Sequence, residues 1–354
     1  MSINTVSFPY RRHALALALA LVMTTGAPSA ATIAVGGNCS LAAAINNANS
    51  DSDTDGAGFG CSAGNGADNL ALDAGTTYTL NTVDNTTDGP NGLPSITSVV
   101  TISGNHSTVK RAPDAPDFRL LHIAGSGELT LDKVVLSGGQ QQDYYLSGGG
   151  IFNQGQLTLT NSTVSGNKVK FGYGGGIDNS GGKLTLTNSR VSGNVSFKGG
   201  GIYNTQGGVI TLTDSTVSGN TAIGGGGGIY SAQKGVATLI NSTVTGNKSE
   251  SGQGGGIYMG GLTDETGSSL TLIKSTVSGN QAALSGGGIN SYRSQVTLTN
   301  SSVSGNSVED GGDSISSASS ALMMTDSTVS AESVRQYGGD MNAYQNMARL
   351  GNSP

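Results

Sequence analysis

The stretch GGGIYNTQGGVITLTDSTVSGN, residues 199–220, is one copy of a unit that recurs along most of this 354-residue chain. The apolar residue after each glycine run returns at spacings of 26, 25, 27, 28, 32, 26 and 26 residues. Internal periods of this size mark one supersecondary unit per repeat, which buries its apolar side only against its neighbours. A stacked solenoid is therefore predicted. The recurring apolar positions are Ile151, Ile177, Ile202, Ile229, Ile257, Ile289, Ile315 and Met341.

Each unit is built of strands rather than helices, because apolar and polar residues alternate, as in Leu157-Thr158-Leu159-Thr160. We expect three short strands per coil, at Gly-Ile-Tyr, Leu-Thr-Leu and Ser-Thr-Val, with Ser-Gly-Asn closing the last corner. Crossovers between parallel strands favour right-handed winding. The predicted fold is an all-β, right-handed parallel β-helix with three-strand coils of about 26 residues.

Inside the coils, the isoleucines that follow the glycines should form one aliphatic stack and the leucines of Leu-Thr-Leu a second. The asparagine that ends each Ser-Gly-Asn should join a structural ladder at a bend, with its amide bonded to neighbouring coils. The six ladder positions are Asn167, Asn194, Asn220, Asn247, Asn280 and Asn306.

The chain opens with features of a secretory signal peptide: Arg11 and Arg12, an apolar run over residues 14–22, and then small residues. The run is too short to span a membrane. Cleavage after Ala31 puts small residues at both recognition positions, so we expect residues 1–31 to be removed. The mature protein is then secreted, periplasmic or on the cell surface of a bacterium.

We divide the remainder into an N-terminal cap (32–95), the β-helix (96–330) and a C-terminal coil or tail (331–354). The two cysteines, Cys39 and Cys61, both lie in the cap, and in an exported chain they are expected to pair. A free or metal-binding pair is the alternative. Losing the leader arginines takes the formal net charge from −6 to −8. Such a chain is not expected to bind nucleic acid.

Residues 32–139 resemble the start of exported β-helix proteins of the CSLREA type. The motif is Cys39-Ser40-Leu41-Ala42-Ala43, where alanines replace the Arg and Glu of that family, and the phrase NGLPSIT at 91–97 is a further match. Ser40 can still cap a short helix at 41–49, although the Ser-x-x-Glu capping box is lost. The repeats themselves are similar to those of polymorphic outer-membrane proteins. The resemblance implies the fold and export, and it implies no reaction.

Catalytic motifs of polysaccharide-degrading β-helices are not evident: the chain lacks an acidic Ca²⁺-binding cluster with a basic residue, and paired aspartates with Gly-His-Gly. His106 and His122 are expected at surface or turn positions, and Asp178 stands alone in a neutral row. Asp310 with Asp313 could bind Ca²⁺ weakly, but a solvated turn is favoured. No metal site or other cofactor is predicted.

One outward row is rich in aromatic residues. If each isoleucine faces inward, the next residue faces outward, which gives Phe152, Asp178, Tyr203, Tyr230, Tyr258 and Asn290, with Tyr144 and Tyr145 near the same end. Aromatic rings there could stack on sugars, but ring stacking also stabilises a sheet without a ligand. A second outward surface carries Thr-x-Thr pairs, which could bind ice, although Ile240 and Ile273 interrupt its outer column.

The sequence therefore favours an exported, non-catalytic surface or matrix protein that binds glycans or other extracellular partners. The alternative is a polysaccharide lyase, hydrolase or epimerase acting on the aromatic face, and ice binding is a remote third. The ring-bearing candidate residues are Phe152, Tyr203, Tyr230, Tyr258, Tyr144 and Tyr145.

Overall fold

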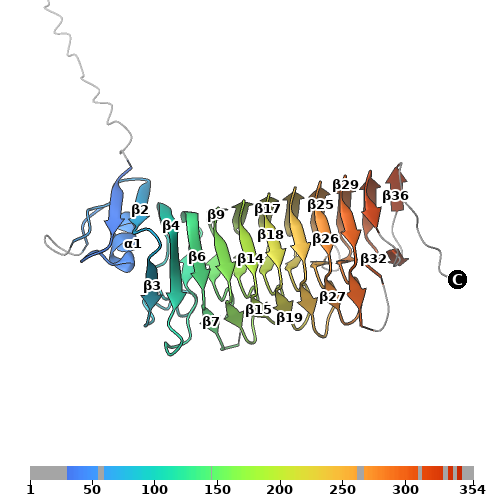
Figure 1. Ribbon diagram of the computed structural model, residues 1–354, viewed down its shortest axis with the longest axis horizontal. Helices are drawn as coiled ribbons and strands as arrows, with labels where there is room; N and C mark the ends of the chain where they lie inside the picture. The colour runs from blue at the N-terminus through green and yellow to red at the C-terminus, as the bar shows by residue number, and fades with distance from the viewer. Residues whose placement is uncertain are drawn as a thin grey trace, which may run out of the picture.

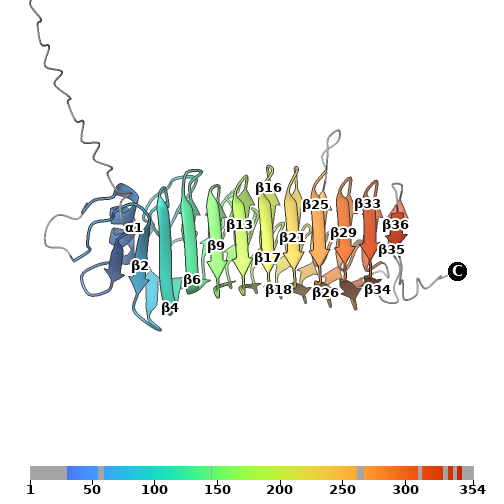
Figure 2. The ribbon, with the colours of Figure 1, turned by 90° about the horizontal axis from the view of Figure 1, so that it is seen from above.

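Strands stack in parallel along a rod in the computed structural model (Figure 1, Figure 2). The predicted signal peptide lies outside the described part of the chain except for residues 30 and 31. No helix among the described residues is long and apolar enough to cross a membrane. The structure describes residues 30–54, 60–144, 146–260, 267–309, 313–329, 334–337 and 341–344.

Sheet I, the largest of three parallel sheets among the described residues, contains both the Leu-Thr-Leu and the Ser-Thr-Val segments. A residue with positive φ, such as Asn161 (φ 51°), bends the chain between the two segments of a coil without moving them to different sheets. Sheet I contains β1 (Thr32–Val35), β2 (Asp68–Leu72), β3 (Thr77–Leu80), β4 (Val99–Arg111), β6 (Glu128–Ser137), β9 (Gln156–Thr160), β10 (Thr163–Ser165), β13 (Lys183–Thr187), β14 (Arg190–Ser192), β17 (Val209–Thr213), β18 (Thr216–Ser218), β21 (Val236–Ile240), β22 (Thr243–Thr245), β25 (Ser269–Ile273), β26 (Thr276–Ser278), β29 (Gln295–Thr299), β30 (Ser302–Ser304), β33 (Ala321–Thr325), β34 (Thr328–Val329) and β36 (Met341–Tyr344).

Sheet II is formed mainly by the segments that follow the glycine runs, as predicted. It contains β5 (Leu121–Ile123), β8 (Ile151–Asn153), β12 (Ile177–Ser180), β16 (Ile202–Thr205), β20 (Ile229–Ala232), β24 (Ile257–Gly260), β28 (Ile289–Tyr292), β32 (Ile315–Ala318) and β35 (Val334–Tyr337). The prediction was wrong for Met341: Val334 occupies the place next to Ile315, and Met341 pairs with Leu322 in sheet I instead.

Sheet III was not predicted. Its strands lie after Ser-Gly-Asn, where only a corner was expected. Its strands are two residues long, too short to show alternation in the sequence. It contains β7 (Gln140–Gln141), β11 (Lys168–Val169), β15 (Val195–Ser196), β19 (Thr221–Ala222), β23 (Lys248–Ser249), β27 (Gln281–Ala282) and β31 (Ser307–Val308).

The core contains the two predicted aliphatic stacks and a third, formed by the valines of the Ser-Thr-Val strands, such as Val191 and Val217. Ile151, Ile177 and Ile202 pair in register across sheet II, and each is fully buried. Leu184 and Leu186 of sheet I are fully buried as well. Each fully buried aliphatic side chain of this size contributes roughly 1.5–3 kcal/mol, so the hydrophobic stacks are the main source of the rod's stability.

The asparagine ladder explains the third glycine of each run. The Asn220 side chain donates to Asn247 Oδ1 at 2.9 Å and to the carbonyl of Val191 at 3.0 Å, and its own Oδ1 accepts from the Asn194 side chain and backbone. A Cβ added to Gly201 would lie 2.7 Å from the Gly228 carbonyl oxygen and 2.9 Å from Asn220 Nδ2. Glycine therefore makes room for the ladder amide.

Two further polar ladders were not anticipated from the sequence. Buried Asn153, Asn179 and Asn204 bond side chain to side chain at 2.6 and 2.8 Å on the inner face of sheet II. At the bend within sheet I, the Ser189 N–H donates to Ser215 Oγ at 3.1 Å, and neighbouring coils repeat this bond. Backbone groups that the bends leave open thus find partners in the next coil.

The cap is continuous with the rod, since β1 pairs with β2 and β2 with β4. Helix α1 (Leu41–Ser50) begins as predicted at Ser40, whose Oγ accepts the Ala43 N–H at 3.1 Å, and Ala44 and Ile45 are fully buried. Cys39 and Cys61 form the expected disulfide. Closing a loop of this length stabilises a fold by about 3 kcal/mol on the chain-entropy model. At the other end, β35 and β36 continue the stacking to residue 344.

Candidate functional site

The predicted aromatic row lies on the outer face of sheet II, and the structure extends it by one residue, His122. Sheet pairing aligns each member with the next, from strand β5 to strand β28. Loops cover part of the row, so Asp178 and Asn290, expected to face solvent, are only 2% and 5% exposed. The aligned residues are His122, Phe152, Asp178, Tyr203, Tyr230, Tyr258 and Asn290.

The rings of this row stack on one another. Centroids of Tyr203 and Tyr230 are 5.2 Å apart and those of Tyr230 and Tyr258 are 4.6 Å apart, with planes within 18°. Tyr173, from a loop that the sequence did not single out, stacks on Tyr203 at 4.6 Å. Burial raises the pKa of the hydroxyls of Tyr203, Tyr230 and Tyr258, so they remain neutral hydrogen-bond donors. Stacking of this kind stabilises the sheet on its own, so the continuous part of the row requires no ligand.

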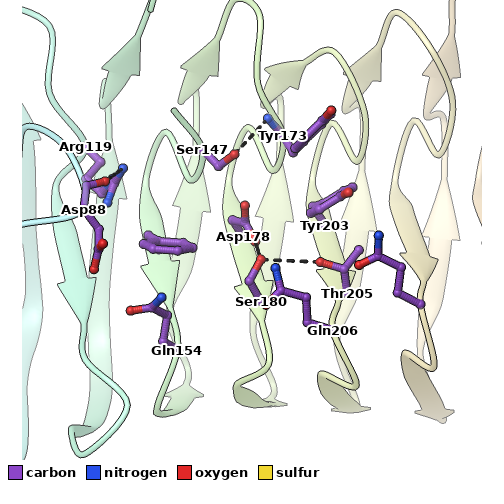
Figure 3. A pocket seen from close by; sticks show the side chains of 12 residues that line it. Asp88, Arg119, Ser147, Gln154, Tyr173, Asp178, Ser180, Tyr203, Thr205 and Gln206 are labelled. Atoms are coloured by element: carbon purple, nitrogen blue, oxygen red, sulfur yellow. Dashed lines mark hydrogen bonds between the residues drawn. The ribbon is translucent and has the colours of Figure 1, made fainter. Parts of the chain in front are cut away.

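Asp178 interrupts the row. Its short side chain occupies the coil between Phe152 and Tyr203, where the neighbouring coils carry rings. Strands in adjacent coils are about 4.8 Å apart, so the two flanking residues stand roughly 9.6 Å apart along the rod. A pocket of about 390 Å³ opens there, which we call the Asp178 pocket (Figure 3). It is lined by Asp88, Arg119, Ser147, Phe152, Gln154, Tyr173, Asp178, Ser180, Tyr203, Thr205, Gln206 and Gln233.

The carboxyl group of Asp178 is not the isolated surface acid that the sequence suggested. Ser180 Oγ donates to its Oδ1 at 2.6 Å, and the Ser147 hydroxyl is a second donor. Burial raises the pKa of Asp178 to about 6, although both hydroxyls and the positive charge of Arg119 act in the opposite direction. Near neutral pH this group can therefore both hold and release a proton.

Arg119, which the sequence analysis did not consider as a site residue, brings a buried cation to the same pocket. It is 1% exposed, and burial lowers its pKa to about 10. Nη2 donates to the Asp88 carbonyl at 2.8 Å, and the guanidinium carbon lies 4.9 Å from the Phe152 ring centroid. Nε and Nη1 have no hydrogen-bond partner among the described residues. Both nitrogens are buried, so Arg119 brings positive charge and unused donors close to the pocket without exposing them.

His122, expected at the surface, is 1% exposed and stacks on Phe152 with centroids 5.6 Å apart. Its Nδ1 lies 2.8 Å from Ser95 Oγ, and its Nε2 lies 3.2 Å from Gln154 Oε1 and 3.5 Å from Asp88 Oδ2. Burial lowers the pKa of the imidazole, so it is neutral at pH 7. The imidazole thus extends the aromatic wall formed by Phe152 and fixes Gln154 at the pocket edge.

The other predicted features lie apart from the pocket or cannot be placed. Tyr144 is 67% exposed and stacks on Phe171 rather than on the row, while Tyr145 lies outside the described residues. Asp310 lies outside them too, and Asp313 is buried rather than in a solvated turn. Among the described residues, no group of three or more His, Cys, Asp or Glu side chains could hold a metal ion.

The Thr-x-Thr pairs on sheet I form two columns along the rod, and isoleucines interrupt the outer one. The inner column is unbroken from Thr101 to Thr297 and ends at Met323 in the next coil. In the outer column, Ile240 and Ile273 are in register with Thr213 and Thr299, which confirms the interruption. Threonine is favoured on exposed strands in any case, so this surface does not indicate a ligand.

One comparison with known proteins supports the fold. A family model described as "Right handed beta helix region" matches residues 150–346, in agreement with the predicted winding. A comparison with curated proteins finds no significant match. Among solved structures, the crystal structure of pectate lyase Pel9A is similar, with 14% identity, a TM-score of 0.47 and coverage of 91% of this chain and 80% of that chain.

Proposed function

This chain belongs to the right-handed β-helix region family, and from that premise we propose that it is an exported, non-catalytic surface or matrix protein that binds an extracellular glycan. One sugar ring would sit in the Asp178 pocket. The observation that carries this proposal is the interruption of an aromatic row by a short acidic residue, which leaves a ring-sized gap with polar groups at its edges.

The chemistry of the pocket suits a sugar. Pyranose rings have apolar C–H faces and a rim of hydroxyl groups, so they are held by aromatic walls together with a few convergent polar groups. Phe152 and Tyr203 supply the walls. Gln154, Gln206 and Gln233 offer both donors and acceptors, and the buried guanidinium of Arg119 adds positive charge beside them.

The continuous tyrosines extend this site along the rod. Tyr230 and Tyr258 follow Tyr203 in register, and their neutral hydroxyls can bond to further units of a polysaccharide. A long glycan lying parallel to the rod axis would then contact the pocket with one unit and the tyrosine edges with the next ones. This geometry favours a polymer over a free monosaccharide.

A second function is favoured by the titration of Asp178. A carboxyl group with a pKa near neutrality, placed in a pocket beside a cation, is typical of acid–base catalysis. A polysaccharide lyase, hydrolase or epimerase acting at Asp178 is the alternative. It differs from the main proposal in one measurable way, because the glycan would be changed and not only bound.

We expect the mature protein to retain at least one polysaccharide from a panel of acidic and neutral polymers in affinity electrophoresis. The same polymers should leave a long incubation with unchanged size by gel filtration and unchanged sugar composition. Shortened chains or inverted sugar units would support the enzyme instead. If no polymer in the panel is retained, the glycan-binding proposal fails.

Tyr203→Ala should weaken retention of that polysaccharide about tenfold, because it removes one wall of the pocket and ring contacts of this kind contribute roughly 1 kcal/mol or more. The matched control is Tyr292→Ala. Tyr292 is 39% exposed and does not line the pocket, so this variant should bind as the wild type does. Equal affinities of the two variants would contradict the placement of the sugar.

A further inference from the structure

At the N-terminal end of the rod, one oxygen of a buried carboxylate has no hydrogen-bond partner among the described residues. Asp68 begins β2 and points inward with Leu70 and Leu72, and it is 1% exposed. Its Oδ1 accepts the Asn65 N–H at 2.8 Å and the Ala31 N–H at 3.2 Å. Oδ2 is buried and has no hydrogen-bond partner among the described residues.

A buried carboxylate of this kind requires a charged partner, because an unpaired charge is costly to remove from water. Among the described residues, no lysine, arginine or histidine forms an ion pair with Asp68. The groups that donate to it are two main-chain nitrogens, that of Asn65 and, next to the expected cleavage site, that of Ala31. In the unprocessed chain this nitrogen is an amide with a single hydrogen.

We propose that Ala31 is the first residue of the mature protein and that its α-ammonium group forms a buried ion pair with Asp68. Hydrolysis by a signal peptidase would break the C–N bond between Ala30 and Ala31, with water adding a hydroxyl to the Ala30 carbonyl and a hydrogen to the Ala31 nitrogen. At neutral pH the new Ala30 carboxylic acid loses its proton and the Ala31 amine gains one. The resulting ammonium carries three hydrogens and can donate to both carboxylate oxygens. This inference rests on the proposed export of the chain and is independent of glycan binding.

The proposed cleavage site lies one residue before the site expected from the sequence. Cleavage after Ala31 would remove its N–H bond to Asp68 and also its carbonyl, which accepts the Asn69 N–H at 2.8 Å. Both bonds attach β1 to β2, and β1 is the terminal strand of sheet I. Terminal strands fray and offer an open edge. Keeping Ala31 therefore keeps two hydrogen bonds that hold β1 against β2.

The first experiment is to express the full chain in a secreting bacterial host and to determine the N-terminal sequence and intact mass of the exported protein. The expected product starts at Ala31. A product that starts at Thr32 or elsewhere would overturn the inference while leaving export intact. A chain that is never cleaved would overturn both the inference and the proposed export, and neither result bears on the Asp178 pocket.

A second experiment tests the ion pair itself. Chains that start at Ala30 and Ala31 are released from a cleavable fusion and melted at pH 7, where an α-amino group is mostly protonated. The Ala31 chain should melt at least about 2 °C higher, and Asp68→Asn should abolish this difference. Equal melting temperatures of the two wild-type chains would overturn the pairing, even if the Asp68→Asn variant does not fold.

Discussion

Replacing Asn220 by alanine is expected to lower the free energy of unfolding by about 3–5 kcal/mol. The change leaves the buried backbone N–H of Asn194 without its acceptor at 3.0 Å and the carbonyl of Val191 without its donor. Each orphaned buried group costs roughly 1–3 kcal/mol, and the side-chain bonds to the asparagines on either side are lost as well. Urea unfolding followed by circular dichroism gives the difference.

The matched control for this variant is Asn188→Gly. Asn188 is exposed, and its side chain donates to the exposed Asn161 in the neighbouring coil, while its backbone bond to Thr213 is kept in the variant. Its φ of 48° favours glycine as the replacement, so a loss below about 1 kcal/mol is expected. If the two variants unfold at the same urea concentration, the inner ladder does not have the structural role assigned to it.

The second large effect concerns Asp178 and pH. The pKa of about 6 in the folded protein lies above the value of about 3.9 for an unfolded chain. Between these values the folded state binds more protons, so this group's favourable contribution is complete below pH 4 and is lost as the pH rises through 6. Asp178→Asn keeps the shape without the charge and should stabilise the protein at pH 7 by up to about 3 kcal/mol.

This gain should disappear at pH 4, where the wild-type carboxyl group is protonated in the folded state. Melting curves of both proteins at pH 4, 5, 6 and 7 test the expectation. Asp214→Asn is a suitable control, because Asp214 lies in an exposed bend of an adjacent coil and bonds to exposed Asn241. A constant difference between Asp178→Asn and wild type over this range would show that the carboxyl is not buried as described.

The rod could be predicted from the sequence because its main interactions repeat with the chain. Each isoleucine at the 26-residue period lies over the previous one, and the asparagines of Ser-Gly-Asn do the same. Local alternation gave the strands of sheets I and II. Sheet III was missed because a two-residue strand such as Lys168–Val169 carries no period, and its hydrogen bonds come from the stacking of whole coils.

The pocket was only partly predictable. The row from Phe152 to Tyr258 follows from the repeat, but the burial of Asp178 depends on the loop that carries Ser147 and Tyr173, which has no regular pattern. Arg119 and His122 precede the first glycine run, so the repeat does not place them. One signal was available: Leu121-His122-Ile123 has the same alternation as the later strands of sheet II.

Other conclusions from the sequence remain predictions. The family match covers residues 150–346 and does not extend to the N-terminal segment that resembles CSLREA-type proteins. The similarity to polymorphic outer-membrane repeats, the export of the protein and its retention at a bacterial surface also stay predictions. The cap helix and its disulfide agree with the resemblance without identifying the family.

Filling the gap in the aromatic row tests the functional proposal most directly. Asp178→Tyr gives that coil the residue present at Tyr203, Tyr230 and Tyr258, so the rod should fold while the pocket is closed. Asn290→Tyr makes a matched change at the far end of the same row, outside the pocket. With a polysaccharide that the wild type retains, we predict that Asp178→Tyr abolishes binding and Asn290→Tyr leaves it unchanged. Full binding by a folded Asp178→Tyr protein would contradict the proposed site.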